Sequence, residues 1–159
     1  MNIFALSHDP HEAARWAIDR HVVKMVLETA QILCAVSWRY GVEAPYRLTH
    51  AQHPCTLWAG ETLPNWHWLL EHGLALAEEY TRRYGKEHKS RTVIEWAALH
   101  GGRPDDGPLT TFAQAMPEHY RGDDPVLAYR AYYVGDKGRI ATWKAPAEPP
   151  LWWKTSLAV

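Results

Sequence analysis

The sequence predicts an all-α fold: a compact single-domain helical bundle over residues 1–159, with a long first helix and an extended C-terminal tail. Three observations support this prediction. Apolar residues recur at helical spacing, glycine or proline stands where such stretches end, and no stretch alternates apolar and polar residues long enough to predict a strand. A chain of 159 residues fits one domain with a substantial core.

The first helix is predicted to be the longest. Asp9 suits the N-cap, Pro10 suits the first turn, and Glu12 follows Asp9 by three residues as in a capping box. Residues 12–40 contain no glycine or proline, and Gly41 supplies a left-handed stop. The apolar residues expected to face the core are Ala14, Ile18, Val22, Met25, Val26, Ile32, Leu33 and Val36.

A loop over residues 42–56 is expected next, followed by a second helical region from Thr56 to Tyr84 that ends at Gly85. Pro64 is expected either to kink this region or to divide it, because an interior proline loses a backbone hydrogen bond.

Three segments complete the chain. A third helix is predicted from Ser90, its N-cap, to His100, and residues 103–123 are expected to form a long surface loop. Asp124 and the proline after it predict a fourth helix, ending near Val134. The proline-rich tail that follows is expected to be extended and to pack across the domain.

Composition excludes several classes of protein. The formal net charge of −1 gives no overall electrostatic attraction to nucleic acid, so binding would require a local patch. No apolar run approaches the ~20 residues of a membrane span, and the N-terminus does not look like a signal peptide, so we expect a cytoplasmic protein without membrane contact. Cys34 and Cys55 are expected to be free, buried thiols.

The first helix also carries a polar stripe. An α-helix repeats every 3.6 residues, so His21, Lys24 and Glu28 share one face, beside the apolar stripe. Side chains at such a border are partly desolvated, which shifts their pKa values in the way that catalytic residues require. The alternative, purely structural interpretation is a solvent-facing Lys24–Glu28 ion pair with a structural His21 next to it. Arg20 is expected to point elsewhere on the helix.

The loop before the second helix contains His50-x-x-His53-x-Cys55. Three potential ligands lie close together, but no second cluster completes a zinc site, so we expect no metal and no cofactor. A loop that lines the active-site cleft is the preferred interpretation. No P-loop, GxGxxG, GxSxG or CxxC motif occurs.

Two basic clusters predict contact with nucleic acid. Five Lys or Arg residues within 82–91 exceed what a helix C-terminus needs, and they suit tracking of phosphates. A second cluster, Lys137, Arg139, Lys144 and Lys154, is mixed with aromatic residues, which suits either stacking on bases or an ordinary packed tail. The candidate nucleic-acid-binding residues are Arg82, Arg83, Lys86, Lys89, Arg91, His50, His53, Lys144 and Lys154.

Several runs resemble a family of small phage and bacterial proteins: Asp19 to Gln31, Thr49 to Cys55, Glu79 to Lys86, Ala115 to Pro117, and Thr142 to Lys144. This resemblance covers nearly the whole chain. More distantly, the chain is similar to the endonuclease V family of phage pyrimidine-dimer DNA glycosylases. Members of that family are compact all-α proteins that use a free N-terminal amine as the nucleophile at the sugar C1′, together with a glutamate on the first helix.

This resemblance implies a function for the polar stripe. Asp19-x-His21 followed by Glu28 is similar in type and spacing to the family's glutamate-bearing segment, so it implies catalytic roles for Glu28 and His21. The implied activity is excision of a damaged or modified base, with or without an AP-lyase step. The implied partner is DNA, double-stranded with a flipped base, and the implied state is a monomer.

The chain departs from the family at its start. Residue 2 is Asn, whose bulk disfavours removal of methionine, so the free amine would belong to Met1. Lys24 is the second candidate nucleophile. Two other functions stay open: an enzyme that modifies nucleotides or DNA bases without excision, and a nucleic-acid-binding module without catalysis.

Overall fold

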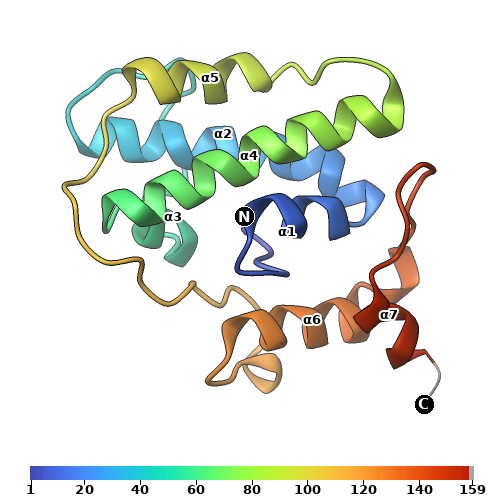
Figure 1. Cartoon of the computed structure of the whole chain (residues 1–159). Coiled ribbons are helices and arrows are strands. Elements are labelled where there is room, and N and C mark those ends of the chain that lie inside the picture. The colour runs from blue at the N-terminus through green and yellow to red at the C-terminus, as the bar shows by residue number, and fades with distance from the viewer. Residues whose placement is uncertain (158–159) are drawn as a thin grey trace.

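The computed structural model describes residues 1–157, and its helices lie in two tiers (Figure 1). The larger tier holds α1, α2, α4 and α5, with α3 at one end, and the smaller tier holds α6 and α7. The residues described contain no strand, so the all-α prediction is confirmed. The helices are α1 (Pro10–Trp16), α2 (Asp19–Arg39), α3 (Pro54–Ala59), α4 (Leu63–Tyr84), α5 (Arg91–His100), α6 (Pro125–Asp136) and α7 (Leu151–Ser156), with 3-10 turns at Glu118–Tyr120 and Gly138–Ile140.

The predicted first helix is two helices. Asp9 caps α1 as predicted, since its side chain accepts a hydrogen bond from the His11 N–H. Glu12 forms no capping box, because it accepts a hydrogen bond from the Ser7 hydroxyl instead. Between Trp16 and Asp19 the backbone is extended, with ψ of 137° at Ala17 and 156° at Ile18. Neither glycine nor proline marks this break.

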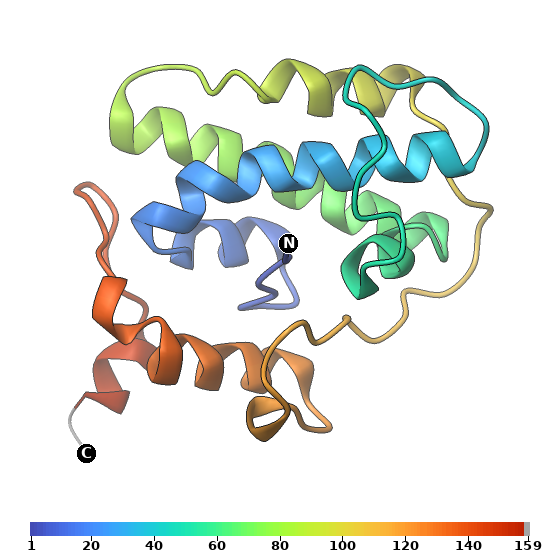
Figure 2. The same ribbon diagram turned by 180° about the vertical axis from the view of Figure 1, so that it is seen from behind.

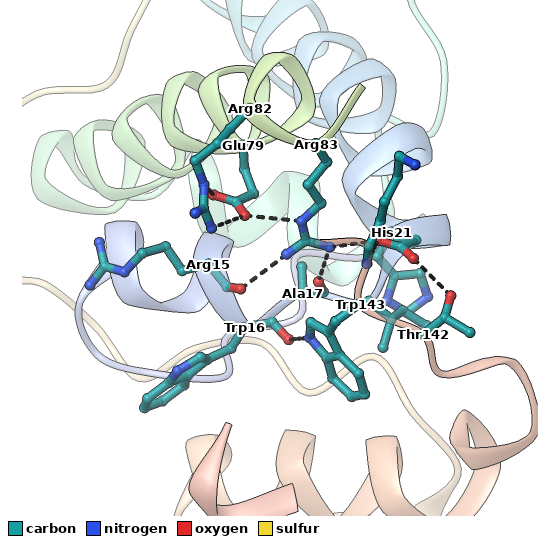
Figure 3. A network of polar contacts seen from close by, with 12 residues as sticks. Arg15, Trp16, Ala17, His21, Glu79, Arg82, Arg83, Thr142 and Trp143 are labelled. Carbon is teal, nitrogen blue, oxygen red and sulfur yellow. Dashed lines mark hydrogen bonds and ion pairs between the residues drawn. The ribbon is translucent and has the colours of Figure 1, made fainter. Parts of the chain in front are cut away.

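The break is filled by Arg83, which reaches in from α4 (Figure 3). Its guanidinium donates to the carbonyl oxygens of Arg15 at 3.0 Å and Ala17 at 2.8 Å. It also pairs with the carboxylates of Asp19 at 3.0 Å and Glu79 at 2.9 Å. A helix end leaves carbonyl groups without partners, and the planar fork of arginine donors satisfies several of them at once. Arg83 therefore holds the geometry in which α2 begins.

The second helical region is divided rather than kinked. Pro64 lies in the first turn of α4, where its missing N–H costs nothing, and Thr62 caps this turn by accepting from the Asn65 N–H. The helix ends at Gly85, as predicted, in the left-handed conformation with φ of 71°. Gly73 lets α4 approach α2 closely, because a Cβ at this position would lie 2.5 Å from Cγ2 of Thr29.

The later helices follow the predictions with two corrections. Ser90 precedes α5 but makes no side-chain cap, and α6 runs to Asp136, past the predicted end at Val134. Asp124 caps α6 as predicted, through the N–H groups of Val126 and Leu127. The predicted extended tail is wrong at residues 151–156, which form α7.

The smaller tier is joined to the larger one at the α1–α2 break. The Asp19 N–H donates to the carbonyl oxygen of Thr142 at 2.8 Å, and the Asp19 carboxylate accepts from the Lys144 N–H at 2.8 Å. The indole N–H of Trp143 donates to the carbonyl of Trp16. Between the two tiers lies the N-terminus, at the centre of both views (Figures 1 and 2).

Cys34 and Cys55 are buried free thiols, as predicted. Burial raises the pKa of the Cys55 thiol to about 12, so it is held in the unreactive protonated form. Within residues 1–157, no helix has both the length and the apolar character that a membrane crossing needs.

Candidate active site

The side chain of Glu28, on α2, meets the first residue of the chain. The Met1 ammonium lies 3.0 Å from Glu28 Oε1, and the Met1 side chain is almost completely buried. Glu28 Oε1 is sealed from solvent and makes no directional hydrogen bond within residues 1–157, so its close partner is the ammonium charge. An amine and a carboxylate in such contact are the minimum for a nucleophile with an adjacent base.

Asn2 holds the segment that carries this amine. Its Oδ1 accepts hydrogen bonds from the N–H groups of Ile3 and Phe4 and from the Tyr129 hydroxyl. Its Nδ2 donates to the carbonyl oxygen of Ala115 at 2.7 Å. The chain therefore turns sharply, and Phe4 takes a positive φ of 43°, which is strained for an aromatic residue.

The amine and Glu28 open onto a cavity of about 300 Å³. Residues from α2, the N-terminal segment and α6 surround it, so both tiers of the fold contribute. The lining consists of Met1, Asn2, Phe4, Arg20, His21, Lys24, Met25, Glu28, Ala115, Tyr132, Lys137 and Ile140. Three predicted site residues, His21, Lys24 and Glu28, thus meet Met1 in one cavity.

His21 is buried at the floor of this cavity. Its Nδ1 lies 2.7 Å from the Tyr133 hydroxyl, and its ring stacks on Phe4 with 3.9 Å between the centroids. Burial, together with the smaller effect of the nearby positive charges of Lys137 and Lys24, lowers the pKa of His21 to about 3. His21 is therefore neutral at physiological pH, which excludes it as a cationic contact for phosphate.

The solvent-facing Lys24–Glu28 ion pair that the helical spacing suggests does not form. Lys24 is exposed and makes no ion pair within residues 1–157, although it lines the same cavity as Glu28. The expectation that Arg20 points elsewhere is wrong, because Arg20 also lines the cavity. Lys137, the residue that follows α6, lines the cavity as well. Three cationic side chains therefore lie around the amine and the carboxylate.

A second hollow adjoins the first. It has a volume of about 430 Å³, shares Lys24 and Glu28 with the first cavity, and is walled mainly by apolar atoms of Val23, Leu27 and Tyr46. A third hollow shares Leu27 and Tyr46 with the second. Its other lining residues are Gln31, Pro45, Arg47 and Thr49. The loop over residues 42–53 therefore lines a groove that runs from Glu28 along α2.

The predicted basic residues do not gather at one place. Lys89 lines the apolar hollow beside Glu28. Arg83 is buried in the α1–α2 break, so it serves the fold and cannot contact nucleic acid. Arg82 pairs with Glu79 at 2.7 Å, next to Arg83 (Figure 3). The remaining candidates line neither of these hollows: Lys86, Lys144 and Lys154 are exposed, and Arg91 pairs with Glu95 at 2.8 Å.

The two histidines of the loop differ in setting. His53 caps α3, since its Nδ1 accepts from the Cys55 N–H at 3.1 Å. Burial lowers the pKa of His53, and the positive charge of the Met1 ammonium adds to this effect. His50 is exposed, with its ring centroid 6.5 Å from that of His53. Residues 1–157 hold no group of three or more His, Cys, Asp or Glu side chains suited to a metal ion.

Three site residues were not found from the sequence. Phe4 lies in an apolar segment without any polar signal, and Tyr133 reads as one aromatic residue among many in the fourth helix. Lys137 was grouped with the C-terminal cluster, but it faces the cavity from beyond the end of α6. Only the packing of the two tiers brings these residues to Glu28.

A family model described as pyrimidine dimer DNA glycosylase matches residues 1–92, more than half of the chain. The match spans the amine, Glu28, His21 and Lys24, together with the loop that lines the groove. No curated protein and no solved structure matches the sequence.

Proposed function

The chain belongs to the pyrimidine dimer DNA glycosylase family, and we propose that it excises a base of a DNA lesion through the α-amine of Met1, with Glu28 moving the protons. Membership in this family makes DNA the substrate. The observation that carries the proposal is the Met1 amine, 3.0 Å from Glu28 Oε1, at a cavity that His21 and three cations also line.

The amine attacks as a free base. An α-amine is in general less basic than the side-chain amine of a lysine, so it gives up its proton more readily. Glu28 is placed to take the proton that the ammonium loses. This favours the amine of Met1 over Lys24, which lines the same cavity without a carboxylate contact.

The excision then balances as follows. The Met1 nitrogen forms a bond to C1′, the bond from C1′ to the base breaks, and the base leaves with the electron pair and takes up a proton. Of the three protons of the ammonium, Glu28 passes one to the departing base and one to O4′ as the C1′–O4′ bond breaks and the sugar ring opens, and the third stays on the protonated Schiff base. In an accompanying lyase step, Glu28 would remove a C2′ proton and the 3′ phosphate would leave.

The groove beside Glu28 suits the DNA around the lesion. Arg20, Lys24 and Lys137 at the cavity, and Lys89 at the adjoining hollow, offer charges to backbone phosphates. The apolar walls of that hollow suit a base that has left the stack. We therefore place the DNA along this face of α2, in double-stranded form.

The direct test is borohydride trapping on a duplex that carries one pyrimidine dimer. We expect a covalent adduct with the unmodified chain, and peptide mapping should place the adduct on Met1. The Glu28→Gln variant should lower adduct formation by about 10²- to 10⁴-fold while it leaves binding to the duplex unchanged. A Lys24→Met variant is the matched control, and it should still form the adduct.

Other outcomes distinguish the alternatives. An adduct mapped to Lys24 would overturn the assignment of the nucleophile. Altered bases without strand or glycosidic cleavage would favour an enzyme that modifies bases without excision. Binding to the duplex without any adduct or product, on damaged and undamaged DNA alike, would favour a binding module.

A further inference from the structure

The hydroxyl group of Tyr133 lies at the α1–α2 break, where it has two neighbours. The backbone N–H of Ile18 donates to this oxygen at 3.4 Å, and His21 Nδ1 lies 2.7 Å away. Ile18 is the N-cap of α2, so its N–H has no partner within the helix. The break therefore supplies a fixed donor for the hydroxyl oxygen.

This arrangement decides the direction of the second hydrogen bond. The N–H of Ile18 can only donate, so the Tyr133 hydroxyl accepts there. If His21 carried its proton on Nδ1, two N–H groups would face one oxygen and the hydroxyl proton would be buried without an acceptor. Tyr133 is completely buried, so no solvent could accept that proton. The Tyr133 hydroxyl therefore donates to His21 Nδ1.

We propose that Tyr133 holds His21 as the tautomer protonated at Nε2, and that this N–H donates a hydrogen bond to a sugar or phosphate oxygen of the nucleotide in the cavity. The proposal rests on the proposed function for the identity of the bound molecule. It makes Tyr133 a positioning residue and His21 a hydrogen-bond donor rather than a base.

The surroundings of His21 support this role. His21 lines the cavity, and its Nε2 is neither hydrogen-bonded nor sealed from solvent within residues 1–157, so this nitrogen faces the open space. The Phe4 ring stacks on the imidazole with an angle of 19° between the planes, which fixes the plane of the ring. The low pKa of His21, about 3, keeps the imidazole neutral.

A neutral donor and cationic donors have different uses at this cavity. Arg20, Lys24 and Lys137 can hold negative charge, but the ammonium of a lysine sits on a flexible stem and places its hydrogen atoms poorly. The His21 ring is held by a hydroxyl on one side and by Phe4 on its face, so its N–H has one direction. Such a donor can orient the sugar for attack at C1′.

Two substitutions at His21 separate this role from a structural one. A glutamine amide reaches the position of Nε2 and can donate into the cavity, whereas an asparagine amide reaches the position of Nδ1 and can only keep the contact with Tyr133. We expect His21→Gln to stay within about tenfold of the unmodified chain in adduct formation, and His21→Asn to fall by about 100-fold or more. The reverse order would overturn the proposal, because it would show that the Tyr133 contact alone matters.

The tautomer is measured independently of activity. Nitrogen-15 NMR of the ring should show His21 protonated at Nε2 across pH 5–8, and Tyr133→Phe should shift the ring nitrogens toward a mixture of tautomers. A His21 protonated at Nδ1 in the unmodified chain would refute the proposal. If no DNA gives an adduct with the unmodified chain, the proposed function fails, and the NMR result still decides the tautomer.

Discussion

Asn2 places the reactive amine with a single side chain. Its four hydrogen bonds hold the turn of residues 2–4 and tie it to Ala115 and Tyr129. Because these contacts fix residue 2, the amine one residue earlier is fixed beside Glu28. An amine on residue 2 itself would start about 3.8 Å away, the distance between consecutive Cα atoms.

This placement leads to a prediction for Asn2→Ser. A small residue at position 2 permits removal of methionine, which would transfer the terminal amine to residue 2. We expect adduct formation with dimer-containing DNA to fall by at least about 100-fold, since misplacement of reacting groups by ~1 Å costs that much. Intact mass confirms the loss of Met1, and borohydride trapping measures the effect.

The matched control is Asn2→Asp, which keeps methionine and keeps the acceptor oxygen for Ile3, Phe4 and Tyr129. It should retain most of the adduct. Equal trapping by the serine variant without Met1 would show that the position of the amine is not decisive.

Single residues also show how far the sequence reaches. The helical stripe of His21, Lys24 and Glu28 was predicted from spacing, and these residues do share a cavity. Spacing alone favoured an ion pair between Lys24 and Glu28, because it cannot see a partner from another segment. The resemblance to a known family suggested the Met1 amine, and the packing of the N-terminal segment brings it to Glu28.

At the scale of elements, the break between α1 and α2 was not predictable from local sequence. Residues 12–40 contain no helix breaker, and the residue that fills the break, Arg83, comes from 66 positions beyond Ala17. Helix ends that have their own signals were predicted well, such as the Asp9 and Asp124 caps and the Gly85 stop. Tertiary contacts override the pattern where a buried charge needs the carbonyl groups.

Arg83→Met tests the importance of this break. The substitution would leave Glu79 and the carbonyl groups of Arg15 and Ala17 without their buried partner. Removal of one member of a buried ion pair costs about 3–5 kcal/mol, so we expect a decrease of that size in the free energy of unfolding, measured by urea denaturation.

Arg82→Met serves as the control in the same helix. Arg82 pairs with the same carboxylate, but its side chain is 43% exposed. Exposed ion pairs contribute about 0–1 kcal/mol, so we expect little change. Equal losses for both variants would contradict a special role of the break.

At the scale of the whole molecule, positive charge is not in excess, but it is concentrated at one place. The net charge is −1, yet Arg20, Lys24 and Lys137 surround one cavity and Lys89 stands at the next hollow. The sequence located the candidate basic clusters but not this gathering, because it joins α2, α6 and the α4–α5 connection in space.

This distribution predicts the salt dependence of DNA binding. Each phosphate contact adds about one unit to the slope of log K against log salt. We expect Lys89→Gln to reduce the slope by about one, measured by binding to a fluorescent duplex at several salt concentrations. Lys86→Gln, on the same connection but away from the hollows, should leave the slope nearly unchanged. A larger effect of the Lys86 substitution would show that the DNA binds away from Glu28.

Two buried histidines predict how stability depends on pH. Burial lowers the pKa of His21 to about 3 and that of His72 to about 4, from 6.5. The unfolded chain therefore binds more protons than the folded chain below pH 6.5, so stability is complete above this pH and falls as the pH drops. At pH 5 each histidine should remove about 2 kcal/mol from the free energy of unfolding.

Urea denaturation at pH 7 and pH 5 measures this loss, about 4 kcal/mol in total. His72→Asn keeps a donor for the carbonyl oxygen of Pro10 but cannot titrate, so the loss between the two pH values should be halved. An unchanged loss in this variant would assign the effect to other groups.

The contacts of Asp19 have a consequence for how such a chain can diverge. The Asp19 carboxylate accepts from the backbone N–H of Lys144, and the Asp19 N–H donates to the backbone carbonyl of Thr142, whose hydroxyl adds one side-chain contact. Every residue type has these backbone groups except proline, which lacks the N–H. The family match ends at residue 92, but the tier that docks on Asp19 lies beyond it. Contacts to main-chain atoms do not depend on which side chains the second tier carries, so most of its residues can be substituted during evolution without loss of this docking. Relatives are therefore expected to share the docking where their later sequences no longer align.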